Sequence, residues 1–436
     1  MSKTQRYSSS TGPKPSFDPK NLPTGWQNYA IGGGAAFAVA VFLFSGKKST
    51  ERKELTPEDK FSKFTKPFDD GSSKKSAPAV ATPITPIVED DNSKPMRDKM
   101  AVFVRKMQKQ IADAVDALEI ESLWQAAKEL GTEPKLCVRD EWIRAEGGKG
   151  LSCVLMDGNV FEKAGVLVSV VHGPASAALI KQMRARGKDG VLEESGVYKM
   201  FAAGCSMVIH PHNPNAPTAH LNYRYLELVK EGEEKPVAAW FGGGCDLTPS
   251  YLFEEDAIHF HQVIKDVCDA HDKEYYPKFK KWCDDYFYIP HRNEARGVGG
   301  IFFDDLVSEN IYIFRKFIEK LSSQERGDHN EIFKFVQQCG LSFVDQYIPI
   351  MKKRWNTPFT PEMKQWQQLR RGRYVEFNLV HDRGTKFGLA TPGARIESIM
   401  CSLPLTARWE YMHFPEEGSR EAELVKVLKT PKDWAV

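Results

Sequence analysis

The sequence predicts an α+β fold in which helices pack on an antiparallel sheet. Apolar residues recur at three- and four-residue steps between positions 100 and 118, a pattern typical of an amphipathic helix. Three short apolar runs then follow one another between positions 205 and 241, and their connections are too short for a crossover helix. Longer helical patterns come after them. Grouped strands followed by grouped helices favour α+β over an alternating α/β architecture.

Composition excludes several classes of protein. The 436 residues carry 60 Lys and Arg against 58 Asp and Glu, and 41% of them are hydrophobic. This hydrophobic fraction can form a large core, which excludes a wholly disordered or collagen-like chain. The balanced charge gives no reason to expect a nucleic-acid partner. The eight Cys are at least 15 residues apart, which excludes CxxC motifs and a disulfide scaffold, so we expect free buried thiols.

Four segments differ in composition. Residues 1–28 form a basic leader of the organelle-targeting kind. Residues 29–46 are apolar and precede Lys47 and Lys48. The run from Tyr29 to Phe44 has sixteen residues, which as a helix would reach about 24 Å. This is shorter than the roughly 30 Å hydrocarbon core of a membrane, but flanking residues that extend toward the membrane surface would allow a membrane anchor of this length. The alternative is a buried apolar helix. Residues 47–95 predict a disordered linker, because they are rich in charged residues, Ser and Pro. Residues 96–436 then form the folded domain.

The folded domain is expected to begin with a helix near Met96. Its buried stripe would consist of Met100, Phe103, Val104, Met107, Ile111, Val115 and Leu118. An Asp-Gly turn at 157–158 separates two β-branched runs, the second at 166–171.

The later elements follow in two groups. We expect a meander of three strands at 205–209, 221–228 and 237–241, because short loops join antiparallel neighbours. We expect helices over 253–288 and 332–355 and a late strand over 374–380.

The strongest chemical pattern lies on two of these strands. Side chains alternate along a strand, so Ser206 and His210 share one face, and His220, Asn222 and Arg224 share one face of the next strand. An apolar core face would not carry such a series, because each polar group needs a buried partner. This face is therefore either solvated or lines a polar cleft, and the Pro-rich loop between the strands favours a cleft.

A second pattern is the run of three glycines at 242–244, followed by Asp246. Glycines after an apolar strand allow a close approach of the backbone. They form neither GxGxxG nor a P-loop. Asp246 is a candidate for chemistry, and its alternative role is to cap a turn or helix.

Two further segments present arginines. Arg296 lies beside a glycine run and could form an anion clamp, or it could pair with Glu294 or with the acids at 304–305. Arg395 follows Gly393 and Ala394 in a flexible turn. Arg binds carboxylates through two parallel hydrogen bonds, so Arg224, Arg296 and Arg395 converging on one cleft would suit a substrate with several carboxylates.

Histidines offer the competing explanation of a metal site. His210, His220, His261 and His291 are far apart in sequence and form no HExxH motif. His261 shares a helix face with Phe260 and other apolar residues, which favours a core or cleft-edge histidine. We therefore predict no metal. A Ser hydrolase is disfavoured because GxSxG is missing.

At these residues the chain resembles the oxygen-dependent coproporphyrinogen III oxidase family. The resemblance covers about Met96 to the end and is carried by long motifs in the family's order. These are SMVIHPHNPNAPTAHLNYR, WFGGGCDLTPSYLFEEDAIHFH, YYPKFKKWCDDYFYIPHRNEARGVGGIFFDDL and YVEFNLVHDRGTKFGLATPGARIESIMCSLP. One departure is Gly393-Ala394-Arg395, where the family usually has Gly-Gly-Arg.

The resemblance implies a large flat antiparallel sheet covered by helices on both sides, with residues 96–436 as the catalytic domain. It implies a homodimer formed through a segment around 375–410. Some bacterial relatives are described with a divalent metal at positions matching the four histidines above. The resemblance also implies a mitochondrial protein, in the intermembrane space on the inner membrane, although relatives also occur in cytosol and plastids.

The implied reaction converts the ring A and B propionates of coproporphyrinogen III to vinyl groups. The products are protoporphyrinogen IX, CO2 and H2O2, with molecular oxygen as co-substrate and no organic cofactor. By motif, His220 resembles the catalytic proton donor. The substrate contacts would be Ser206, Asn222, Tyr223, Arg224, Gly393, Ala394 and Arg395.

The chemistry of the residues fits this reaction. The pyrrole can supply the electrons to oxygen itself, so the protein needs to orient the substrate, exclude water and manage protons. We expect Asp246 to pair with pyrrole N–H groups and His220 to handle the protons of a peroxide intermediate. Two alternatives remain: a non-catalytic tetrapyrrole carrier on a membrane anchor, and a His-based metalloenzyme acting on another anion.

Overall fold

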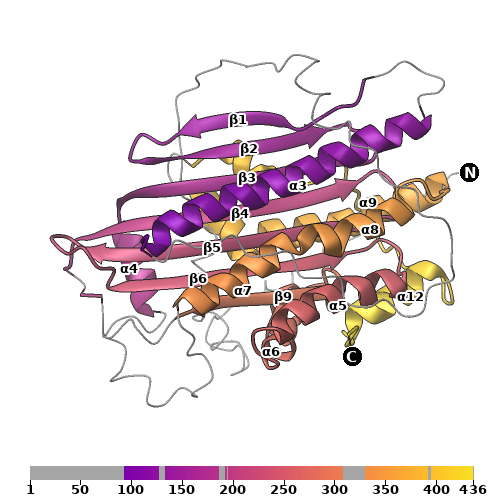
Figure 1. The fold of residues 1–436 in the computed structure, drawn as a ribbon. Coiled ribbons are helices and arrows are strands. Elements are labelled where there is room, and N and C mark those ends of the chain that lie inside the picture. Colours follow the sequence, from indigo (N-terminus) through magenta and orange to yellow (C-terminus); the bar gives the residue numbers. More distant parts are fainter. Residues whose placement is uncertain are drawn as a thin grey trace, which may run out of the picture.

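The computed structural model describes residues 93–126, 133–185, 192–193, 195–307, 329–390 and 394–435. Its centre is a sheet of seven strands, all antiparallel, in the order β1-β2-β3-β4-β5-β6-β9 (Figure 1). The strands are β1 (Val138–Ile143), β2 (Gly148–Met156), β3 (Phe161–Pro174), β4 (Tyr198–Pro211), β5 (Thr218–Lys230), β6 (Ala238–Thr248) and β9 (Gly299–Leu306). A short hairpin of β7 (Tyr288–Ile289) and β8 (Glu294–Ala295) precedes β9. The predicted meander is confirmed and is extended on both sides.

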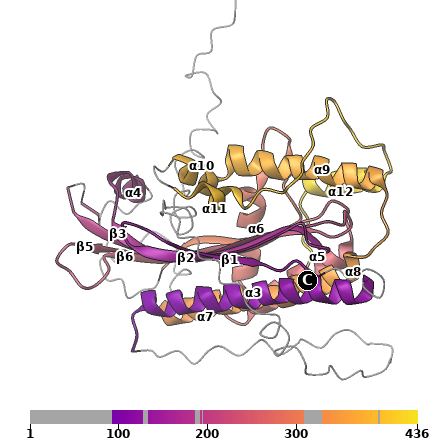
Figure 2. The same ribbon diagram turned by 90° about the horizontal axis from the view of Figure 1, so that it is seen from above.

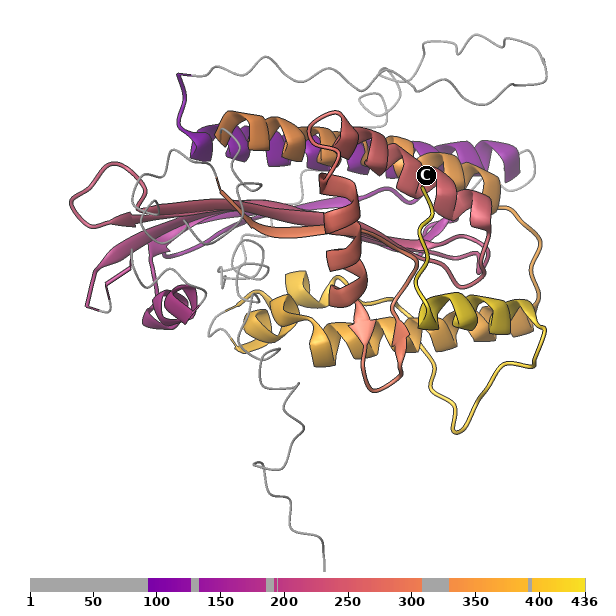
Figure 3. The same ribbon diagram turned by 90° about the horizontal axis from the view of Figure 1, so that it is seen from below.

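Helices cover both faces of this sheet (Figures 2 and 3). One layer holds α3 (Met96–Ala126), α5 (Glu254–Asp269), α7 (His329–Leu341) and α8 (Phe343–Arg354). The opposite layer holds α4 (Ala177–Met183), α9 (Pro361–Glu376), α10 (Arg383–Ala390), α11 (Ile396–Met400) and α12 (Arg420–Lys429). Helix α6 (Tyr275–Tyr286) packs along β9 at the sheet edge, where Tyr286 stacks on Phe302 with ring centroids 4.3 Å apart. The predicted α+β class, with helices on both faces, is confirmed.

The principal core lies between the sheet and the layer that begins with α3. All seven predicted stripe residues of this helix are buried there, with exposed fractions of 3% or less. The eight cysteines are buried and free, as expected. A second, smaller core fills one end of the opposite face, between the sheet and α4. The sheet is therefore largely apolar on one face and only partly apolar on the other.

The layer of α9 is attached to the sheet mainly by polar contacts. Arg371 of α9 donates a hydrogen bond to buried Glu162. Burial alone would raise the pKa of Glu162, but the charges of Arg371 and Lys364 lower it to about 2. Gln367 donates to the carbonyl of Pro211 at 3.1 Å. Because these contacts are directional, they fix the position of α9 over the sheet more narrowly than apolar packing would.

Several predicted boundaries were wrong. The strand expected over 374–380 is helical, because helix α9 starts at the Thr360 cap, includes Tyr374 and passes into a π-helical turn, η5 (Phe377–His381). Its β-forming residues are overridden by the helix that precedes them. The helices expected over 253–288 and 332–355 are each split in two, the second at Ser342.

Several elements were not predicted, and three of them, β1, β9 and α9, lack a clear apolar period. Strand β1 is a charged edge strand, VRDEWI, and β9 begins with two glycines and ends with acids. Helix α9 buries arginines and glutamine on its sheet side, so it has no apolar stripe. None of the helices in the described ranges is long and apolar enough to cross a membrane, and the expected leader, anchor and linker (1–28, 29–46 and 47–95) lie almost wholly outside those ranges.

Candidate active site

The polar face predicted from strand alternation exists and lies under the layer of α9 to α11. In the register of β4 and β5, Ser206 is opposite Asn222. On β5 and β6, His220 is opposite Asp246 and Arg224 is opposite Gly242. Directly opposed residues share one face of a sheet, so these side chains form a continuous polar area beside the second core. The glycine run adds no side chain to it.

The centre of this area is a buried triad of His220, Asp246 and Arg296. One terminal guanidinium nitrogen of Arg296 (Nη2) donates to both carboxylate oxygens of Asp246, each at 2.7 Å. The Oδ1 oxygen also lies 2.8 Å from Nδ1 of His220. Asp246 is 1% exposed and Arg296 is 3% exposed, so water screens this ion pair little. Asp246 therefore does not cap a helix, since it lies within strand β6.

This geometry sets the protonation of the triad. Burial alone would raise the pKa of Asp246, but the Arg296 charge and the His220 hydrogen bond hold that pKa below its ordinary value. An ionised carboxylate only accepts hydrogen bonds, so Nδ1 of His220 must carry the proton that it donates. The Nε2 atom of His220 is then left as the ring nitrogen that can gain or lose a proton.

Aromatic rings surround the Arg296 guanidinium. Its central carbon lies 4.0 Å from the ring centre of Phe287, 4.7 Å from that of Tyr374 and 4.9 Å from that of Phe377. These rings come from the end of α6, from α9 and from η5. They stabilise the cation and exclude water from it. Arg296 thus joins the sheet, the edge helix and the opposite layer at one point.

Arg224 is neutralised in a similar way. It donates to Asp304 of β9 at 2.8 Å and to Asn222 at 3.1 Å, and all three side chains are buried. A Cβ atom on Gly242 would lie 2.6 Å from both Arg224 and Asp304, so a larger residue there would displace the ends of these paired side chains. The close approach expected at the glycine run is therefore between the backbone at Gly242 and two side chains of the protein, and not between the backbone and a ligand.

The structure separates other predicted residues from this centre. Tyr223 points to the opposite face, where it is 0% exposed in the principal core. Arg395 lies at the start of α11 beside β1, where it pairs with Asp140, and Ala394 packs against the second core. Gly393 lies outside the described residues.

The four separated histidines do not come together. His210 is near Thr218 and the Ser402 carbonyl, His261 near Tyr276 and the Val298 carbonyl. Burial lowers the pKa of both His210 and His261 to about 3, so both are neutral at physiological pH.

Of the remaining two, His220 belongs to the triad, and His291 is exposed and contacts Glu376 at 2.7 Å and His381 at 2.9 Å. In the part of the chain that the structure describes, no three His, Cys, Asp or Glu side chains gather as metal ligands would.

Sequence reasoning missed several residues at this face, namely Asp304 as the partner of Arg224, Asp140 as the partner of Arg395, and Lys163. Lys163 lies on β3, opposite His210. Alternation along β3 could have placed Lys163 on the polar face. Lys163 is an even number of residues from Leu167, which lies opposite Ser206, and from Ser169. Asp140 and Asp304 could not have been paired with their arginines from sequence, because 255 and 80 residues separate the partners.

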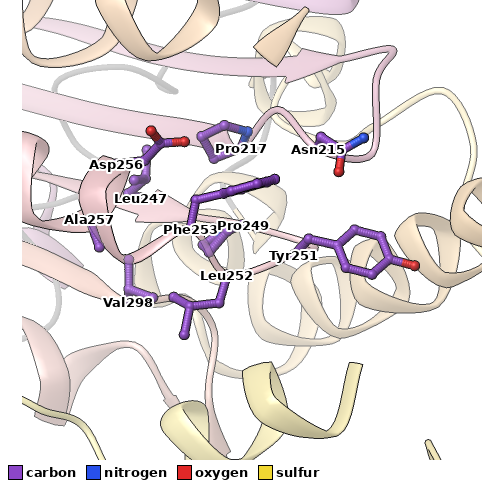
Figure 4. Close-up of a pocket in the computed structure, with 10 residues that line it drawn as sticks. All are labelled: Asn215, Pro217, Leu247, Pro249, Tyr251, Leu252, Phe253, Asp256, Ala257 and Val298. Atoms are coloured by element: carbon purple, nitrogen blue, oxygen red, sulfur yellow. The ribbon is translucent and has the colours of Figure 1, made fainter. Parts of the chain in front are cut away.

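Two cavities among the described residues differ in place and in size. One lies between the end of β6 and the start of α5, and its lining includes Leu247, Phe253 and Val298 (Figure 4). Its volume of about 10 Å³ is enough for a single water molecule at most. The other lies over β1 to β3 and measures about 250 Å³, and it contains Arg395 in its wall.

Comparison with known proteins identifies the family. Residues 99–434 match the family described as coproporphyrinogen III oxidase. The chain is 58% identical over 296 residues to human mitochondrial oxygen-dependent coproporphyrinogen-III oxidase, which covers 68% of this chain and 60% of the human one. It is 47% identical to the rat mitochondrial protein over 93% of this chain and 84% of the rat one.

A plastid relative is similar over nearly the same length. The chain is 44% identical over 403 residues to coproporphyrinogen-III oxidase 1, chloroplastic, from Arabidopsis thaliana, which covers 88% of this chain and 95% of the plant one. The family match over 99–434 includes every strand described above, and every helix except the first three residues of α3. The chain therefore belongs to the coproporphyrinogen III oxidase family.

Proposed function

We propose that this chain catalyses the oxygen-dependent oxidative decarboxylation of the ring A and B propionates of coproporphyrinogen III. The products are protoporphyrinogen IX, CO2 and H2O2, and the reaction belongs to heme biosynthesis. The observation that carries this proposal is the membership of the family together with the His220–Asp246–Arg296 triad on its polar sheet face. The names of the relatives state the dependence on oxygen and the substrate.

The atoms and electrons of each step balance without an organic cofactor. The carboxylate of a propionate leaves as CO2, and the side-chain carbon next to the pyrrole loses one hydrogen with two electrons. Molecular oxygen accepts these and one further proton and becomes H2O2, while a vinyl group remains. The electron-rich pyrrole supports the loss of electrons, so the protein's task is to orient the substrate and to move protons.

Asp246 takes a different role in this proposal from the expected pairing with pyrrole N–H groups. Both of its oxygens accept from Arg296, and one also accepts from His220. We therefore assign to Asp246 the orientation of His220, and to Nε2 of His220 the proton transfer. This division of work resembles a buried Asp that holds a catalytic His in one tautomer.

Substrate carboxylates and pyrroles would contact the rest of this face. Ser206, Asn222 and Arg224 lie on the same side of the sheet as His220. Arg395 is better placed to bind a carboxylate than Arg224 or Arg296, because its side chain is 25% exposed whereas theirs are each 2% exposed.

A homodimer formed around residues 375–410 is part of the proposal. Nine of the sixteen exposed large hydrophobic side chains of the described residues lie between positions 379 and 414. Tyr411 is 97% exposed, Phe414 is 74% exposed and Trp409 is 54% exposed. This concentration of exposed apolar residues supports the proposed protein–protein contact.

We also place the chain in mitochondria, in the intermembrane space on the inner membrane. The basic leader at 1–28 and the apolar segment at 29–46 support this location. The human, rat and mouse relatives are named as mitochondrial. The chloroplastic relatives make a plastid location the competing alternative.

The activity is tested with the full chain and coproporphyrinogen III under air, under nitrogen, and under air with a metal chelator. We expect protoporphyrin, read by fluorescence after oxidation and chromatography, only where oxygen is present and with or without chelator. Binding of the substrate without any turnover would instead indicate a carrier. Turnover under air that is lost when the chelator is added would indicate a metalloenzyme.

Replacement of Asp246 tests the role of the triad. In Asp246→Asn the carboxylate that orients His220 is lost and the Arg296 charge is left unpaired. We expect turnover to fall by roughly 10²- to 10⁴-fold, in line with losses in other Asp–His pairs. The matched control is Asp284→Asn, which removes a carboxylate paired with Lys280 outside the site. Turnover within threefold of wild type, in a variant that still folds by circular dichroism, would contradict the role.

The dimer surface is tested by adding charge to it. We expect the double variant Tyr411→Asp, Phe414→Asp to sediment as a single chain where the wild type sediments as two, because burying a carboxylate at an apolar contact is costly. Val102→Asp is the control, since Val102 is 68% exposed on α3, in the helical layer on the other face of the sheet. A wild-type chain that sediments as a monomer would remove the dimer from the proposal.

The location is tested by fractionation of eukaryotic cells that express the full chain. We expect it with mitochondrial membranes, protected from added protease until the outer membrane is ruptured. A variant lacking residues 29–46 should lose its association with the membrane pellet. Recovery in plastids, or protection that survives rupture of the outer membrane, would refute the proposed compartment.

A further inference from the structure

The 250 Å³ cavity lies on the same polar face as His220 but nearer the β1 edge of the sheet. One row of directly opposed residues connects the two regions: Asp140, Ser152, Leu167, Ser206 and Asn222 on β1 to β5. Four interstrand spacings separate the ends of this row, or about 19 Å. The carboxylates of a tetrapyrrole lie around the rim of the ring, so some of them must point away from the one that reacts.

The cavity holds two cations and two anions. Lys163 and Arg395 are in its wall together with Asp140 and Glu397. Lys163 donates to the carbonyl of Leu403 at 2.8 Å, which holds it at the junction of the sheet and the opposite layer. The volume of the cavity lies just below the roughly 300–1,000 Å³ of ordinary ligand pockets. The cavity therefore suits one carboxylate-bearing arm of a larger ligand.

Arg395 and Asp140, both in the lining of this cavity, form an ion pair with each other. The two side chains are 25% and 51% exposed, so this pair is far more solvated than the Arg296–Asp246 pair. Exposed pairs of this kind contribute little to folding stability. Asp140 belongs to an edge strand and can turn its carboxylate into water at small cost, whereas Arg395 would keep its place in the cavity wall.

We propose that Asp140 occupies, in the substrate-free protein, the position on Arg395 that a substrate carboxylate takes on binding. This inference rests on the proposed function and adds a specificity-determining residue to it. Binding then exchanges one carboxylate for another on the same guanidinium, so the cavity never holds an unpaired Arg395.

The exchange favours ligands with several carboxylates. A ligand already held near His220 presents its distal carboxylate to Arg395 at a high effective concentration and can displace Asp140. A small monocarboxylate has no second attachment and must compete with Asp140 from bulk solution. Asp140 thereby lowers the affinity for all anions but lowers it least for the tetracarboxylate.

The test measures binding separately from turnover. The probe is coproporphyrin III, the oxidised tetracarboxylate, titrated by fluorescence against the full chain. We expect Asp140→Asn to bind it roughly two- to fivefold more tightly, as loss of a competing exposed pair implies. We expect KM for coproporphyrinogen III to fall by a similar factor and kcat to remain unchanged. The matched control, Glu141→Gln, removes the neighbouring carboxylate on the other face of β1 and should change neither constant.

A double-mutant cycle shows whether the effect passes through Arg395. Arg395→Ala should weaken binding of coproporphyrin III, and adding Asp140→Asn to it should have no further effect. Asp140→Ser repeats the test with a side chain too short to reach Arg395, should the Asn variant fold poorly. Unchanged or weaker binding by both Asp140 variants would overturn the inference, as would a gain that persists without Arg395. Absent turnover in the wild type would refute the proposed function, while the binding cycle would still decide the role of Asp140.

Discussion

The ion pair between Asp246 and Arg296 is the contact on which the arrangement of the site depends. It joins strand β6 to the segment after β8, and the rings of Phe287, Tyr374 and Phe377 join it to both α6 and the opposite helical layer. Displacing one partner of such a buried pair is strongly destabilising, because the other charge is then left buried with neither a counter-charge nor water around it. The pair therefore requires the sheet, the edge helix and the α9 layer to be positioned together.

The two faces of the sheet divide the work of the domain. The face under α3, α5, α7 and α8 is continuous apolar core and supplies most of the hydrophobic burial. The other face has a small apolar core at one end, an apolar cluster around Phe302 at the β9 edge, and polar contacts between them. Helix α9 covers this face through Arg371 and Gln367. A polar surface can be held in a fixed position here because the rigid apolar face behind it does not need to adapt.

The charges of the polar face are graded by exposure. Arg296 and Arg224 are buried against carboxylates of the sheet, where they fix His220 and Asn222. Arg395 and Lys163 line the open cavity, where a carboxylate of a ligand can reach them. The grading separates cations that hold the protein together from cations that can exchange partners, because only the exposed pairs can be rehydrated at low cost.

The sequence alone determined the antiparallel meander, the buried stripe of α3 and the shared face of His220, Asn222 and Arg224, because alternation and helical periodicity are local properties of the chain. It also carried the family motifs. Only the tertiary structure decided that Tyr223 faces the core, that Asp246 is engaged by Arg296, and that residues 374–380 are helical. Partners such as Asp140 and Arg395 come together only when the chain folds, since they are 255 positions apart in the sequence and no local pattern encodes that contact.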